Sequence, residues 1–162
     1  MENAGDPHLF KETDFLSAWR LFLQTYRRVL DELSDELEER QGLPLAWYDV
    51  LIQLYRSPEN RLRMNELAGS ILLSKSGLTR LIDRMEKAGM VERASCPTDR
   101  RGSFAVLTPR GEEVFKEAAP IHLEGIVRHF TDHLTPEEAG TMVGAFERIL
   151  EALKQPVEKV SV

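Results

Sequence analysis

The side chains best suited to specific chemistry in this sequence are hydroxyls and cationic groups on one predicted helix, residues 74–88. The apolar side of that helix is formed by Leu78, Leu81, Ile82 and Met85. The opposite side therefore carries Lys75, Ser76, Thr79, Arg80, Asp83 and Arg84. Arginine can donate two hydrogen bonds to O6 and N7 of guanine, and short hydroxyls can reach bases or phosphates. On duplex DNA we expect base contacts from Ser76, Thr79 and Arg80, and phosphate contacts from Lys75 and Arg84.

A second cluster of cations follows on a turn-rich segment between two predicted strands. Residues 90–94 and 103–107 alternate in character as short strands do, and the polar segment between them predicts a β-hairpin with a long basic tip. Arg100 and Arg101 on such a tip could enter the minor groove, where the negative potential of DNA is strongest. We expect Asp99 to support one of these arginines through a charge-assisted hydrogen bond.

The charge of the chain is unevenly distributed. The whole sequence has a formal net charge of −6, whereas residues 61–101 contain nine basic and five acidic side chains and therefore carry +4. The remainder of the chain carries −10. A basic region within an acidic chain is typical of a localised anion-binding face whose surroundings repel a misplaced polyanion. The acidic total therefore does not exclude a nucleic acid as the partner.

Periodic apolar residues predict the helices that must position these groups. Spacings of three and four predict one long helix over residues 14–41 and a second over residues 45–56. Two shorter helices, 63–70 and 74–88, are joined by only three or four residues, which is typical of a helix-turn-helix. Together with the hairpin, they predict a winged helix-turn-helix DNA-binding lobe over residues 45–109.

Two further helices are predicted after the hairpin. One begins at Thr108-Pro109 and contains Pro120, which is expected to kink or split it, and the last begins at Thr135. The apolar stripe of the first helix is too long for a monomer of this size to cover easily. We therefore expect residues 14–41 and 110–155 to be dimerisation helices. The predicted fold is mainly α, one intertwined domain with a small β-hairpin wing.

Three segments of the sequence resemble the MarR family of winged helix-turn-helix transcription regulators. They are residues 72–93 (LLSKSGLTRLIDRMEKAGMVER), 99–102 (DRRG) and 107–111 (LTPRG). The order of predicted helices resembles the family from about residue 14 to residue 153. The resemblance implies a triangular homodimer that binds a pseudo-palindromic operator with one recognition helix per half-site. It also implies a repressor that leaves DNA when a small phenolic or anionic ligand enters a cleft between the dimer and DNA lobes.

The first two predicted helices are those that would line the ligand cleft of this family. Trp19, Arg20 and Trp47 lie on them, and a planar anionic ligand that stacks on Trp47 and pairs with Arg20 is a candidate. Aromatic residues at helical spacing are also typical of a core or a dimer interface. The resemblance therefore implies a small aromatic or anionic effector, we expect no cofactor, and the role of these aromatic residues stays open.

Three histidines suggest an alternative function. His122, His129 and His133 are seven and four residues apart, and the last two have the spacing of a metal-binding pair on a helix. With Glu124 or Asp132 as a further ligand, the protein would be a zinc-sensing regulator. A second ligand cluster is missing, however, and histidines on a solvated helix face have the same pattern.

The remaining observations restrict the function classes. The single cysteine, Cys96, rules out an internal disulfide and is either an incidental thiol or a redox trigger beside Arg93. The motifs of serine hydrolases, zinc proteases and phosphate-binding loops are absent, so we expect no enzymatic activity. An acidic N-terminus and the lack of a long apolar segment predict a cytoplasmic protein without a membrane partner. A winged-helix module that binds another protein rather than DNA is the second alternative.

Overall fold

The computed structural model describes residues 14–71, 75–96 and 99–154. The helices and strands, in chain order, are α1 (Asp14–Gln41), α2 (Leu45–Arg56), η2 (Pro58–Asn60), β1 (Arg61–Arg63), α3 (Met64–Ser70), α4 (Lys75–Lys87), β2 (Val91–Cys96), β3 (Asp99–Leu107), α5 (Pro109–His129), η3 (Thr131–His133) and α6 (Pro136–Lys154). The helices predicted from periodicity are confirmed, α1 and α2 at the expected residues. The mainly α class with a small β wing is confirmed as well.

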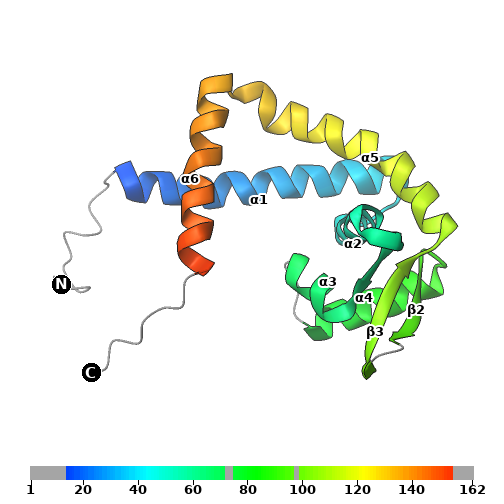
Figure 1. The fold of residues 1–162 in the computed structure, drawn as a ribbon. Coiled ribbons are helices and arrows are strands. Elements are labelled where there is room, and N and C mark those ends of the chain that lie inside the picture. Colours follow the sequence, from blue (N-terminus) through cyan, green and yellow to red (C-terminus); the bar gives the residue numbers. More distant parts are fainter. Residues whose placement is uncertain (1–13, 72–74, 97–98, 155–162) are drawn as a thin grey trace, which may run out of the picture.

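The elements form two parts that share one long helix (Figure 1). The helices α2, α3 and α4 and the small sheet make a compact lobe, while α1, the distal part of α5, and α6 form an open helical frame. The main apolar core lies in the lobe and includes the fully buried Leu51, Leu67, Leu81, Ile82 and Met85. In the frame, by contrast, α1 buries only Leu33 and Leu37, and α6 buries no residue.

The sheet has three strands in the order β1-β3-β2, and all neighbours are antiparallel. Strand β1, in which Arg63 pairs with Phe104, was not predicted from the sequence. The basic residues of the hairpin were expected on a long tip. The structure corrects this, because β2 extends to Cys96 and β3 begins at Asp99, so that the backbone of Arg100 and Arg101 belongs to β3.

The joint between the lobe and α5 depends on two glycines and one threonine. Helix α4 ends at Gly89, whose φ of 73° is readily adopted only by glycine, and the amide of Met90 donates to the carbonyl of Met85. Thr108 caps α5 by accepting from the amide of Gly111 at 3.0 Å, and its hydroxyl donates to the carbonyl of Gly89 at 2.7 Å. The Thr108 side chain therefore connects the end of α4, the end of β3 and the start of α5.

Helix α5 continues from the lobe into the frame without interruption. Pro120 lies inside it and was expected to kink or split it; the helix is not split, and a kink stays a prediction. The helix ends at His129, and Phe130 then leaves helical geometry with a φ of −136°. The last helix, α6, is capped by two reciprocal hydrogen bonds at its N-terminus. The amide of Thr135 donates to the carboxylate of Glu138, and the amide of Glu138 donates to the hydroxyl of Thr135.

Candidate nucleic-acid interface

Helix α4 has one buried and one exposed face, as the sequence predicts. Four residues fill the core side, each no more than 2 % exposed, namely Leu78, Leu81, Ile82 and Met85. Ser76, Thr79, Arg80 and Arg84 are exposed. Arg80 and Arg84 form no ion pair with any residue in the described ranges, so both guanidinium groups are available to an anion. Lys75 is the first residue of α4, and its side chain lies outside the described part of the structure.

The wing lies beside α4 on the same end of the lobe (Figure 1). The side chains of Asp99, Arg100 and Arg101 lie outside the described residues, so the expected support of an arginine by Asp99 stays a prediction. The backbone of all three is in β3, which places them at the distal end of the wing. A helix that presents hydroxyls and guanidinium groups, next to a basic hairpin, provides donors for both the bases and the backbone of DNA.

Not every cation of the basic region is available for DNA. Arg61 forms an ion pair with Glu59 at 2.5 Å, and its guanidinium lies 5.2 Å from the centre of the Phe104 ring. Arg93 forms an ion pair with Asp83 at 2.6 Å. The count of charges along the sequence did not reveal these pairs, because their partners are fixed by the packing of β2 and η2. Arg61 and Arg93 therefore contribute less free positive charge to this surface than the count along the sequence suggests.

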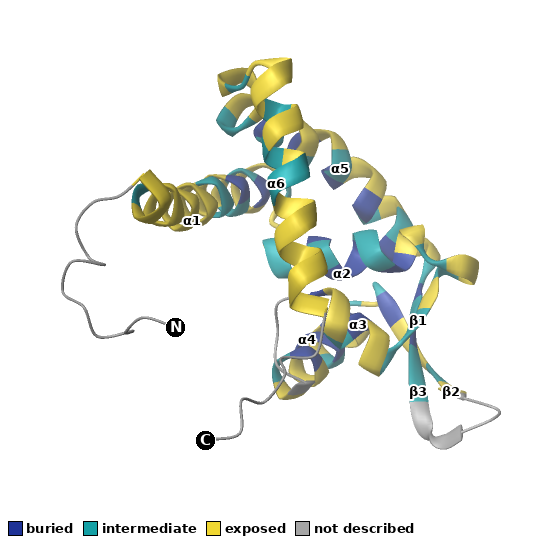
Figure 2. Ribbon diagram, turned by 60° about the vertical axis from the view of Figure 1, so that its left-hand side comes forward, coloured by how far each residue is buried: buried dark blue, intermediate teal, exposed yellow. Residues whose placement is uncertain are grey.

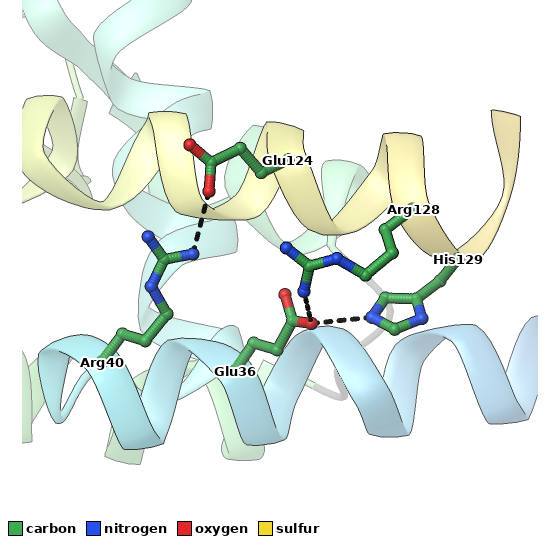
Figure 3. Close-up of polar contacts among 5 residues, drawn as sticks. All are labelled: Glu36, Arg40, Glu124, Arg128 and His129. Carbon is green, nitrogen blue, oxygen red and sulfur yellow. Dashed lines mark hydrogen bonds and ion pairs between the residues drawn. The ribbon is translucent and has the colours of Figure 1, made fainter. Parts of the chain in front are cut away.

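A polar network holds α1 against α5 in the frame (Figure 3). Glu36 on α1 accepts a bond from Arg128 at 2.5 Å and contacts Nε2 of His129 at 2.7 Å, both at its Oε1 atom. Arg40 donates to Glu124 at 3.0 Å one turn away. This network was not predicted from the sequence, because it joins residues 84 to 93 positions apart. These bonds keep the two long helices in register.

The structure places the three histidines in different surroundings. His129 ends α5, whereas His133 lies in the separate turn η3, so the two do not share a helix face and the predicted metal-binding pair is wrong. His122 packs on the Tyr48 ring with the ring centres 4.3 Å apart, and burial lowers its pKa. Among the described residues no group of three or more possible ligands could hold a metal ion. The zinc-sensing alternative therefore loses its geometric basis.

The Glu36 contacts predict how stability depends on pH. The bond from His129 and the charges of Arg128 and His129 lower the pKa of Glu36 below its ordinary 4.5, although burial opposes this. Stability from Glu36 is therefore fully present above its unfolded-state pKa and is lost as the pH falls through the lower folded-state pKa. Between about pH 5.5 and 3, the melting temperature of Glu36→Gln should therefore fall less steeply with decreasing pH than that of the wild type. The exposed Glu39→Gln should keep the wild-type slope, and equal slopes for all three proteins would contradict the assignment.

The candidate ligand residues are not brought together within one chain. Trp19 and Arg20 lie in the second turn of α1, and Trp19 is 59 % exposed beside Phe22. Trp47 lies at the start of α2 and is packed against the core. About 33 Å of helix separate Trp19 from Gln41, which immediately precedes the α1–α2 connection. Within one chain, Trp19 and Trp47 therefore do not line a common site.

Much of α1 and α6 is exposed, as the yellow parts of these helices in Figure 2 show, and many of their exposed side chains are apolar. The large exposed apolar side chains of these two helices include Phe15, Trp19, Leu21, Phe22, Leu23, Tyr26, Val143, Phe146, Ile149, Leu150 and Leu153. Phe22 and Phe146 are in contact, with ring centres 5.5 Å apart, so the two faces are continuous. A continuous exposed apolar face of this kind marks an interaction surface.

The helix-turn-helix of α3 and α4, followed by the β2–β3 wing, defines a winged helix-turn-helix protein. The family model of the MarR family matches residues 41–102, which include α3, α4, β2 and the first residues of β3. The chain is 31 % identical over 131 residues to an uncharacterized HTH-type transcriptional regulator of Bacillus cereus, covering 81 % of this chain and 80 % of that protein.

Solved structures give the same result over nearly the full length. AbsC, a MarR family transcriptional regulator from Streptomyces coelicolor, has a TM-score of 0.82 and 39 % identity, covering 89 % of this chain and 97 % of AbsC. Sco3205 of the same organism, solved in complex with DNA, has a TM-score of 0.81 and 35 % identity, covering 94 % and 96 %. The chain belongs to the MarR family and is a transcriptional regulator. In the described ranges, no helix combines the length and apolar character needed to cross a membrane.

Proposed function

We propose that this protein binds duplex DNA as a homodimer, with α4 in the major groove and the wing in the minor groove. The observation that carries the proposal is the exposed face of α4. This face presents Ser76, Thr79, Arg80 and Arg84, while the opposite side of the helix is buried in the core. Base contacts come from Ser76, Thr79 and Arg80, and phosphate contacts from Lys75 and Arg84. Arg100 and Arg101 enter the minor groove from the wing. Sco3205 was solved with DNA, which supports the same partner here.

The homodimer rests on the continuous apolar face of α1 and α6. A second copy that covers this face would remove Phe22, Phe146 and their neighbours from water and place two copies of α4 on one side of the assembly. A two-fold dimer requires a pseudo-palindromic operator, with half-sites about 34–36 Å apart if they are separated by one turn of DNA. Sedimentation in solution distinguishes this arrangement from a monomer by a doubled mass.

The regulatory part of the proposal is repression relieved by a small aromatic or anionic effector. Trp19 and Arg20 of one subunit and Trp47 of the other would line a cleft between subunits, because one chain alone does not bring them together. Once the operator is known, screening aromatic acids for release of the duplex tests this part independently of DNA binding.

The salt dependence of binding tests the DNA contacts. The duplex is first selected from a random pool, and its affinity is then measured over a range of salt concentrations. About four neutralised phosphates per subunit give a dimer slope near −7 for log affinity against log salt. A slope shallower than about −2 on every duplex would contradict the assigned phosphate contacts, since few counterions would then be released. That outcome would favour a module that binds another protein.

A further inference from the structure

We propose that Arg93 is a positioning residue for DNA recognition, because it fixes α4 and the wing strand β2 at one relative position. The inference rests on the proposed DNA binding, and it assigns Arg93 to the contact between α4 and β2 rather than to a phosphate. Its partners are Thr79, Asp83 and Glu86, all on α4. Specific recognition then depends on a residue that does not itself touch DNA.

Four contacts from one residue define the geometry. The Nη1 atom of Arg93 lies 2.6 Å from Oδ1 of Asp83 and 3.7 Å from Oε2 of Glu86. Its Nη2 atom donates to the carbonyl of Thr79 at 3.4 Å, and its backbone amide donates to Oε1 of Glu86 at 3.2 Å. Thr79, Asp83 and Glu86 span two turns of α4. Contacts over two turns restrict rotation as well as translation of the helix relative to the strand.

The position of Arg93 in the sheet makes these contacts possible. Arg93 pairs with the buried Ala105 of β3, and Val91, two residues earlier on the same strand face, is 1 % exposed. Alternation along β2 therefore points Arg93 to the side of the sheet that packs on α4. The neighbouring Glu92 points to the other side, where it is exposed opposite Val106. Consecutive acidic and basic residues of one strand thus have different surroundings.

Two observations distinguish positioning from direct DNA binding. Arg93 is already paired with Asp83 and lies close to Glu86, so its charge is compensated before any phosphate arrives. Its partners also extend along the helix whose exposed residues Thr79 and Arg80 are the proposed base contacts. With 32 % of the Arg93 side chain exposed, the ion pair is partly solvated, and such pairs contribute little to global stability. The expected effect is therefore on specificity more than on folding.

The decisive variant is Asp83→Asn, because positioning and simple electrostatics predict opposite results for it. Removing a carboxylate near DNA should tighten binding to every duplex if charge alone matters. If Asp83 holds α4 through Arg93, affinity for the selected duplex should fall about tenfold, the size expected for one displaced base contact. Binding to a scrambled duplex should stay constant or tighten slightly. The readout is the ratio of the two affinities at one salt concentration.

Glu92→Gln is the matched control, because it removes one carboxylate from the same strand without touching the Arg93 contacts. It should leave the ratio of selected to scrambled affinity unchanged. Arg93→Gln should lower that ratio as Asp83→Asn does, and the double variant should lower it no further, since both changes break one unit. Arg93→Lys should restore only part of it, because an ammonium group cannot bridge Thr79, Asp83 and Glu86 together.

Hydrogen exchange on the free protein separates failure of this inference from failure of the proposed function. Amides of residues 91–95 should exchange faster in Asp83→Asn and Arg93→Gln than in the wild type or Glu92→Gln. Faster exchange without any preference of the wild type for the selected duplex would overturn the DNA-binding proposal and retain the contact of α4 with β2. Unchanged exchange, or an Asp83→Asn variant that tightens both duplexes in parallel with Glu92→Gln, would overturn the role of Arg93.

Discussion

Replacing Gly111 with alanine is expected to lower the free energy of unfolding by about 3 kcal/mol or more, because the site has no room for a methyl group. A Cβ atom on Gly111 would overlap the carbonyl oxygen of Met90 and lie 2.9 Å from Cδ1 of Leu107. The first of these atoms is backbone at the junction of α4 and β2, so neither helix nor strand can yield alone. For a chain of this length the melting temperature should fall by about 6 °C or more.

Gly69→Ala is the control for this prediction. Gly69 lies in α3 of the same lobe and is exposed, and a methyl group added to it would have no atom within 4 Å. Alanine has the higher helix propensity, so this variant should be neutral or more stable by up to about 1 kcal/mol. Equal melting temperatures for Gly111→Ala and the wild type would show that α5 can move away from the wing without cost. The close approach at Met90 would then have no structural importance.

Reversing the charges of Arg80 and Arg100 together should weaken binding to the selected duplex at least about 100-fold. A lost arginine contact to guanine costs about 1–3 kcal/mol of discrimination, and each glutamate adds repulsion from the phosphates. Arg80 is on the exposed face of α4 and Arg100 is in β3 of the wing, so the double variant affects both reading elements. Fluorescence anisotropy with the labelled duplex at one fixed salt concentration measures the loss.

Lys116→Glu with Lys154→Glu makes the same change in net charge away from the reading surface. Lys116 is in α5 and Lys154 ends α6, and both are exposed and paired with a glutamate on their own helix. This control should change affinity only a few-fold, because the charges lie outside the groove contacts. If Arg80→Glu with Arg100→Glu binds as the wild type does, α4 and the wing do not read DNA. The winged helix would then be a protein-interaction module.

The long helices could be predicted closely because their apolar periodicity is repeated over many turns. Over residues 14–41 and 45–56 each additional turn adds evidence for the same face. Strand β1 was missed because Arg61–Arg63 is three residues long and shows no more than one alternation. The histidine spacing was misleading because Phe130 breaks the helix between His129 and His133, and no glycine or proline marks that break.

The candidate site was predictable in its residue types but not in its pairings. The buried side of α4 follows from spacing alone, and it leaves Ser76, Thr79 and Arg80 exposed. The ion pair of Arg93 does not follow from spacing, because its partner Asp83 lies ten residues away across a turn of the chain. A charge count treats the cations of a region as equivalent. Packing decides which of them remain available to an anion.

Because α5 is continuous through Pro120, it connects the lobe directly to the helical frame. This helix has 21 residues, begins at the lobe beside Gly89 and ends in the frame at the Glu36 network. At 1.5 Å per residue it is about 31 Å long, so a tilt of about 10° at one end displaces the other by about 5 Å. That displacement exceeds the 3.4 Å rise of one base pair. In the proposed homodimer, small adjustments between subunits would thus suffice to move the two copies of α4 out of register with consecutive grooves of DNA.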